Sequence, residues 1–118
     1  MMVPGKPVRV LVATKPVDFR KGMDGLVALV QEHLRDDPFS GAVFVFRSKR
    51  RADRVKLVWW DGSGLCLFAK RLENGRFYWP PIEDGTIKLS GAQLSALIEG
   101  MQWTRVRAVE AKTPQAVQ

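Results

Sequence analysis

The sequence predicts an α+β domain, in which an antiparallel sheet of about four to six strands is built from hairpins and two amphipathic helices pack on one face. Alternating apolar side chains separated by tight-turn residues fill the middle of the chain, which is typical of β-hairpins. Apolar residues recur at helical spacing in two segments that flank this region. The 118 residues are 46% hydrophobic and 26% charged, as in one ordinary globular domain.

The first two elements are a strand and a helix. Val8, Val10 and Val12 alternate with other residues, which predicts a strand whose place in the sheet stays open. A helix follows, with an apolar stripe made of Met23, Leu26, Val27, Val30 and Leu34. Asp18 is the expected N-cap, and the residues before Pro38 should end the helix. The spacing of Gly22 and Gly25 predicts that another backbone packs close to them.

Three turns predict the strand registers of the central region. The Asp61–Gly64 turn sets Trp59 opposite Cys66 and Leu57 opposite Phe68. The Asn74-Gly75 turn would form a second hairpin, with Leu72 opposite Phe77 and Lys70 opposite Trp79. An upstream hairpin through residues 48–53 would set Phe46 opposite Val55 and Phe44 opposite Leu57.

Strict alternation then sorts these side chains onto two faces. The expected core face carries Phe44, Phe46, Val55, Leu57, Trp59, Cys66, Phe68, Leu72, Phe77 and Trp79, with Lys70 as its only charge. The expected outer face carries Val43, Val45, Arg47, Arg54, Lys56, Val58, Trp60, Leu65, Leu67, Arg71, Arg76 and Tyr78. The outer face therefore mixes cations with apolar and aromatic side chains.

The last element is a helix with clear boundary signals. Ser90 and Gln93 form a capping box, Leu89 and Leu94 a hydrophobic staple, and Gly100 marks the end. The domain organisation follows: a flexible N-terminus over residues 1–7, a single domain over residues 8–103, and a disordered C-terminal tail over residues 104–118.

Catalysis, metals and cofactors find little support in the composition. Cys66 and His33 are the single cysteine and histidine, too few for a disulfide framework or a zinc cluster. No phosphate-loop, dinucleotide or triad motif is present, and the carboxylates lie in caps, turns and loops. No apolar run approaches the ~20 residues of a membrane span, so we expect a soluble, cytoplasmic protein without a cofactor.

The net charge of +7 favours a polyanionic partner, and nearly all of the excess falls within residues 47–76. A basic β-ribbon has dimensions that suit a nucleic-acid groove. The expected nucleic-acid contacts are Arg47, Lys49, Arg50, Arg51, Arg54, Lys56, Arg71 and Arg76, joined by Arg20 and Lys21 at the start of the first helix. Trp60 and Tyr78 are the expected stacking or partner-anchoring side chains. The alternative is a solvated charged turn, with Trp60 covered by a helix.

Three long motifs are similar to a known family. They are Asp18-Phe-Arg-Lys-Gly-Met-Asp-Gly-Leu, the stretch from Phe44 to Lys56, and the stretch from Trp59 to Glu73. With Gly75-Arg-Phe-Tyr-Trp-Pro they resemble the TnpB (second-reading-frame, Orf2-like) accessory protein of IS66-type bacterial insertion sequences, over about residues 8–103. The resemblance implies a non-catalytic protein encoded beside a separate DDE transposase and a companion accessory protein, with no cofactor.

Three hypotheses remain open. The first is a transposition accessory that binds DNA or other nucleic acid through the basic hairpin face. The second is a module that docks on the transposase or the companion accessory protein through Trp60, Val58, Leu67 and Tyr78. The third and least supported is a metal-dependent nuclease, which would use carboxylates among Asp18, Asp24, Asp61 and Asp84.

Overall fold

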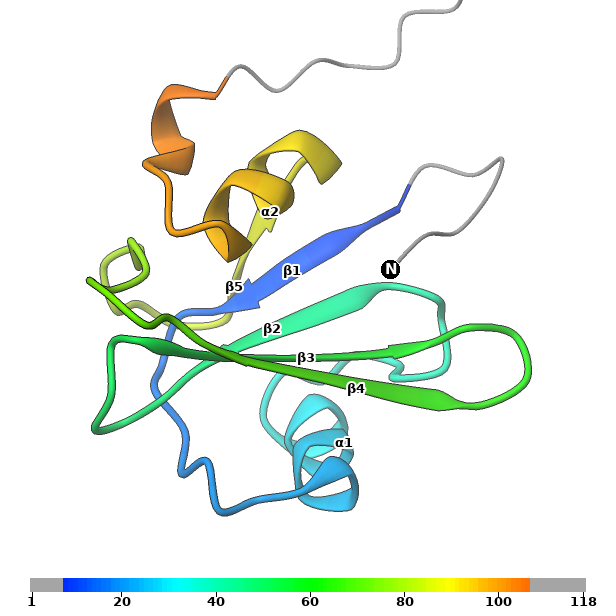
Figure 1. Cartoon of the computed structure of the whole chain (residues 1–118). Coiled ribbons are helices and arrows are strands. Elements are labelled where there is room, and N and C mark those ends of the chain that lie inside the picture. Colours follow the sequence, from blue (N-terminus) through cyan, green and yellow to red (C-terminus); the bar gives the residue numbers. More distant parts are fainter. Residues whose placement is uncertain (1–7, 107–118) are drawn as a thin grey trace, which may run out of the picture.

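The computed structural model describes residues 8–106 and has a five-stranded mixed sheet with two helices (Figure 1). The α+β class and the mainly antiparallel sheet are confirmed. Along the chain the elements are β1 (Val10–Ala13), α1 (Met23–Glu32), β2 (Val43–Arg47), β3 (Arg54–Trp60), β4 (Leu65–Arg71), β5 (Thr86–Leu89), α2 (Gly91–Ile98) and the 3₁₀ turn η1 (Trp103–Arg105). The strand order is β4-β3-β2-β1-β5, and among these five strands the β1–β2 pair is the parallel one.

The parallel pair explains where α1 lies. Parallel neighbours cannot be joined by a tight turn, so the chain leaves β1, forms α1 across one face and returns as β2. β1 thereby becomes an inner strand between β2 and β5, and all four of its residues are buried. The place of the first strand, which the sequence left open, is thus between a parallel and an antiparallel neighbour.

The β3–β4 hairpin has the predicted register. Trp59 pairs with Cys66 and Leu57 with Phe68. The turn is held by Asp61, whose Oδ1 accepts hydrogen bonds from the backbone N–H groups of Ser63 and Gly64, each at 2.9 Å. A local side chain–backbone turn of this kind is readable from sequence because it needs no distant partner.

The predicted β2–β3 register is wrong by one residue. The structure pairs Val45 with Leu57 and Arg47 with Val55, so Phe44 and Phe46 lie on the opposite face from Leu57. Residues 43–46 are all buried, because both faces of β2 are covered. An uninterrupted apolar strand carries no inside–outside pattern, and its register therefore cannot be chosen from alternation.

The predicted hairpin at Asn74-Gly75 does not form. The chain turns there, with Gly75 at φ +80°, but the following residues leave the sheet and β4 stays an edge strand. Phe77 instead donates its N–H to the carbonyl of Ala52 at 2.9 Å and buries its ring in the core. Pro80 and Pro81 follow, and proline cannot supply the N–H groups that a paired strand needs.

The two helices lie on opposite faces of the sheet rather than on one face as predicted (Figure 1). On one face, α2 packs with Val12, Val45 and Leu57. On the other, α1 packs with Leu11, Phe44, Phe46 and Val58. The expected outer face is therefore a second core, because the inner strands are apolar on both sides and each side must be covered.

The ends of the two helices differ in how well they were predicted. The capping box of Ser90 and Gln93 is confirmed, with Ser90 Oγ accepting from the Gln93 N–H at 3.0 Å. The N-cap of α1 is Gly22 and not Asp18. The close backbone expected beside Gly25 is absent from the described part of the chain, where a Cβ at that glycine would meet the Lys21 side chain at 3.1 Å.

The described domain continues to Val106, three residues beyond the predicted boundary. Trp103 is buried against the α2-side core, and Val106 packs there as well. Gln93 Nε2 donates to the carbonyl of Val106 at 3.3 Å. The predicted flexible N-terminus (1–7) and residues 107–118 of the predicted tail lie outside the described residues.

The second core predicts unequal costs for two truncations on the α1 side of the sheet. Phe44→Ala should destabilise the fold by about 3–5 kcal/mol, because it leaves a cavity beneath α1. Leu67→Ala, on the same face but 38% exposed, should cost less than about 1 kcal/mol. Urea unfolding followed by circular dichroism measures both, and equal small costs would contradict a core on this face.

Candidate nucleic-acid interface

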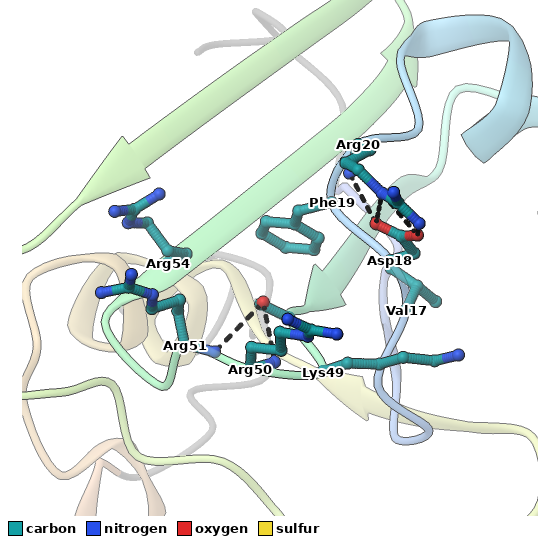
Figure 2. Close-up of a pocket in the computed structure, with 9 residues that line it drawn as sticks. Val17, Asp18, Phe19, Arg20, Lys49, Arg50, Arg51 and Arg54 are labelled. Carbon is teal, nitrogen blue, oxygen red and sulfur yellow. Dashed lines mark hydrogen bonds and ion pairs between the residues drawn. The ribbon is translucent and has the colours of Figure 1, made fainter.

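Two segments distant in sequence form a basic cleft at one end of the sheet. We use this name for the cleft of about 520 Å³ that residues 17–20, 48–51 and 54 line (Figure 2). Five of its side chains are cationic and one is a carboxylate. The cations are Arg20, Lys49, Arg50, Arg51 and Arg54, and the carboxylate is Asp18.

Backbone hydrogen bonds hold the two segments together. Val17 donates its N–H to the carbonyl of Arg47 at 2.8 Å, and Lys49 donates to the carbonyl of Val17 at 2.9 Å. Within the β2–β3 loop, Ser48 Oγ accepts the N–H groups of both Arg50 and Arg51, each at 3.2 Å. The loop is therefore fixed by its own serine and by the neighbouring segment.

The other side of the β2–β3 loop is also held. The carbonyl of Ala52 accepts the Phe77 N–H at 2.9 Å and the indole N–H of Trp79 at 3.3 Å. The loop thus lies between residues 17–19 and residues 77–79 and is not a freely protruding ribbon. Its cations surround a hollow, which differs from the groove-inserting finger that the sequence suggested.

Asp18 and Arg20 form the tightest ion pair of the cleft. Arg20 NH2 lies 2.6 Å from Asp18 Oδ2, and the backbone N–H of Arg20 donates to Asp18 Oδ1 at 2.9 Å. These hydrogen bonds from Arg20 hold the pKa of Asp18 well below its ordinary value. Asp18 therefore stays ionised to a lower pH than an ordinary aspartate does, and it orients Arg20, which lines the cleft.

Lys56 does not line the cleft but holds the segment that carries Phe19. Its Nζ donates to the carbonyls of Phe19 at 2.7 Å and of Lys21 at 3.0 Å, and it lies 5.1 Å from the centroid of the Phe19 ring. The ammonium thus binds two backbone acceptors and an aromatic ring of the segment that precedes α1. These contacts of Lys56 position the segment that carries Phe19.

Arg47 and Arg76 lie at a second cleft of about 410 Å³, which Tyr78 and Trp103 also line. Arg47 donates to the carbonyl of Pro80 at 2.7 Å and lies 5.5 Å from the centroid of the Trp79 ring. Burial lowers the pKa of Arg47. The structure does not bring these two arginines together with the basic cleft.

Arg54 and Arg71 extend the positive charge from the basic cleft onto β4. They are direct partners in the β3–β4 ladder, an arrangement that like charges disfavour. Within residues 8–106 each has a single, long ion pair, Arg54 Nε to Asp53 at 3.6 Å and Arg71 to Glu73 at 3.5 Å. Two facing arginines with weak internal compensation favour an external anion.

Trp60 and Tyr78 do not share a surface. Trp60 packs edge-on against Phe39, with ring centroids 5.6 Å apart, and lies about 20 Å along β3 from Arg54. Tyr78 is 44% exposed and belongs to the second cleft. Val58, expected beside them, is fully buried under α1. On this face α1 therefore covers Val58, whereas the ring that packs on Trp60 is Phe39, from the segment between α1 and β2.

Sequence reasoning missed Phe19, Val17 and Ser48 as parts of the site. Phe19 lines the cleft, with Arg51 and Arg54 on one side of its ring and Arg20 on the other (Figure 2). The sequence feature that could have identified Phe19 is its position directly before Arg20 and Lys21 in one motif. Residues 17–19 and the β2–β3 loop are about thirty positions apart, and only the β1–α1–β2 crossover brings them side by side.

The described residues offer little for metal-dependent chemistry. No group of three or more His, Cys, Asp or Glu side chains that could hold a metal ion occurs among them. Asp61 accepts hydrogen bonds within the β3–β4 turn, and Asp84 forms an ion pair with Lys15 at 2.9 Å. His33 is exposed at the end of α1, and Cys66 is half-buried with a pKa that burial raises. No helix within residues 8–106 is long and apolar enough to cross a membrane.

The Asp18–Arg20 pair predicts a pH-dependent effect. Because the pKa of Asp18 is depressed in the folded state, its stabilising contribution is present above about pH 4 and is lost as the pH falls below that. Arg20→Ala should raise the pKa of Asp18 toward 3.8 in a carboxyl NMR titration. Asp61, held by the Ser63 and Gly64 N–H groups, is the internal control and should not move. An unchanged Asp18 titration would contradict the pairing.

The comparisons with known proteins agree with the resemblance seen in the motifs. The chain is 49% identical over 117 residues to "Uncharacterized protein y4jC" of Sinorhizobium fredii, with 99% of both chains covered. It is 48% identical over 103 residues to "Uncharacterized protein y4hO" of the same organism, with 87% of this chain and 89% of the relative covered. No solved structure matches. The family model described as IS66 Orf2 like protein matches residues 8–108, so this chain belongs to the IS66 Orf2-like family.

Proposed function

We propose that this protein is a non-catalytic transposition accessory that binds nucleic acid through the basic cleft. The convergence of five cations from two distant segments on one hollow is the observation that carries this proposal. The family supports an accessory role, and the phosphate backbone is the polyanion that transposition places nearby. A cytoplasmic location, where the element's DNA lies, is part of the same proposal.

The electrostatics of the loop support an anionic ligand. Lys49, Arg50 and Arg51 are exposed, and none of them forms an ion pair with another described residue. Fixing three adjacent cations in one turn raises their mutual repulsion, which phosphate groups would relieve. Because the loop is already held by Ser48 and by both neighbouring segments, binding would cost little ordering entropy.

The cations divide into three roles under this proposal. Lys49, Arg50, Arg51 and Arg54 contact phosphates, with Arg20, Lys21 and Arg71 as flanking contacts. Lys56 positions the segment that carries Phe19. Arg47 and Arg76, beside the second cleft, would meet the nucleic acid only if its path continued around the β2–β3 loop.

The proposal predicts a steep salt dependence. If about five phosphates are neutralised, the logarithm of the association constant should fall with the logarithm of salt concentration with a slope near −4.5. Arg50→Ala combined with Arg51→Ala should weaken binding and reduce the slope by about 2. Fluorescence anisotropy of a labelled oligonucleotide over a salt series measures both quantities.

The matched control removes two other cations. Arg9→Ala combined with Lys88→Ala takes away the same charge at sites remote from the cleft, since Arg9 precedes β1 at the other end of the strands and Lys88 lies on the far edge strand β5. This variant should keep most of the affinity and slope. Equal losses in the two variants, or a flat salt response of the native protein, would refute binding at the cleft.

A second candidate function is docking on the element's DDE transposase or companion accessory protein. The observation that favours it is the second cleft, where Tyr78 is 44% exposed beside Pro81 and Trp103. Aromatic and arginine side chains gathered at one cleft are typical of the centre of a protein interface. Trp60 and Leu67, expected in this patch, lie on the α1 side instead.

A pull-down separates the two candidates. The tagged protein, isolated from cells that carry the intact element, should lose a protein partner on Tyr78→Ala if the second cleft docks it. Such a partner should remain bound after nuclease treatment and in high salt. Leu67→Ala, at a similarly exposed position on the other side, is the control and should retain it. Loss of every partner with nuclease would exclude direct docking.

A further inference from the structure

We propose that the basic cleft receives an unpaired nucleotide, whose base stacks on Phe19 while the adjoining phosphates bind the surrounding arginines. This inference rests on the proposed nucleic-acid function and narrows it to single-stranded or locally unpaired segments. Its geometric basis is the position of one aromatic ring within a set of five cations (Figure 2).

The ring of Phe19 is supported on the protein side and borders the cleft. Phe19 is half-buried, packs at the margin of the α1-side core, and has the ammonium of Lys56 5.1 Å from its centroid. The same ammonium binds the Phe19 carbonyl at 2.7 Å and so fixes the backbone beneath the ring. A ring held in this way is a rigid platform, and stacking on it would order little further chain.

The cations are placed for the phosphates on either side of such a base. Arg51 and Arg54 lie on one side of the Phe19 ring, and Arg20 lies on the other (Figure 2). Arg50 and Lys49 line the same cleft along the β2–β3 loop. A strand crossing the cleft would therefore pass cations before and after it reaches the ring, which is the usual arrangement of single-strand binding grooves.

A duplex would not use this arrangement. In paired DNA the base faces are stacked on one another, and only the phosphates and the groove edges reach a protein. The β2–β3 loop is tied to residues 17–19 and 77–79 and so cannot extend into a groove as a free ribbon. A hollow of about 520 Å³ lies in the usual range of small-ligand sites, and an extruded base with its sugar is a ligand of that class.

The test compares three labelled probes by anisotropy at one salt concentration. They are single-stranded oligothymidylate, oligouridylate and a DNA duplex with the same number of phosphates. Native protein should bind the single strands more tightly than the duplex. Phe19→Leu keeps an apolar side chain over Lys56 but removes the ring, and should weaken single-strand binding by about 5- to 150-fold with little effect on the duplex. Phe19→Tyr keeps the ring and should retain the affinity.

The outcomes separate this inference from the function on which it rests. If native protein binds the duplex as well as the single strands and Phe19→Leu changes nothing, stacking is refuted while phosphate binding stands. If native protein binds no probe, the proposed function itself fails. Thermal unfolding of Phe19→Leu checks that the variant is folded, and loss of binding in both Phe19→Leu and Phe19→Tyr would assign Phe19 a structural role only.

Discussion

The arrangement of the candidate site depends on the backbone hydrogen bonds that hold the β2–β3 loop on both sides. On one side Val17 bonds to Arg47 and Lys49, and on the other Phe77 and the Trp79 indole bond to Ala52. Without them, a loop so rich in cations would repel itself and sample many conformations. With them, the cations are fixed around the cleft before any ligand binds. The loop therefore loses its conformational entropy on folding, and little further entropy is lost on binding.

This constraint depends in turn on the two-sided core. The α1 crossover brings residues 17–19 beside the end of β2, and the burial of Phe77 on the α2 side brings residues 77–79 beside the loop. Each face of the sheet thus contributes one of the two segments that hold the loop. Covering both faces also buries the inner strands β1 and β2, and the basic cleft lies instead at the end of the strands, where segments from both layers meet.

The parts of the fold that could be predicted from sequence are those with local causes. The Asp61 turn and the Ser90 capping box each satisfy their own hydrogen bonds within four residues, and both are confirmed. The predicted pairing of β2 with β3 was wrong because residues 43–46 are buried on both faces and show no alternation. At Asn74-Gly75 the turn itself was right, but the direction of the chain beyond it was decided by the distant core site that buries Phe77. For the site, the charge pattern located the loop, whereas the ring of Phe19 could be placed there only through tertiary structure.

The structure also shows that the positive charge of this chain has two physical uses. Lys56, Lys70 and Arg47 each donate to a backbone carbonyl at 2.7 Å, those of Phe19, Ile98 and Pro80 respectively, and so satisfy acceptors in loops and at the end of α2. Lys49, Arg50 and Arg51 have no such acceptors among the described residues and face solvent on a fixed turn. Net charge alone cannot separate these groups, because both raise it equally. The difference follows from the position of each cation: Arg47, Lys56 and Lys70 lie on strands beside packed segments whose carbonyls they reach, while Lys49, Arg50 and Arg51 lie in the β2–β3 loop, where no described carbonyl accepts from their side chains.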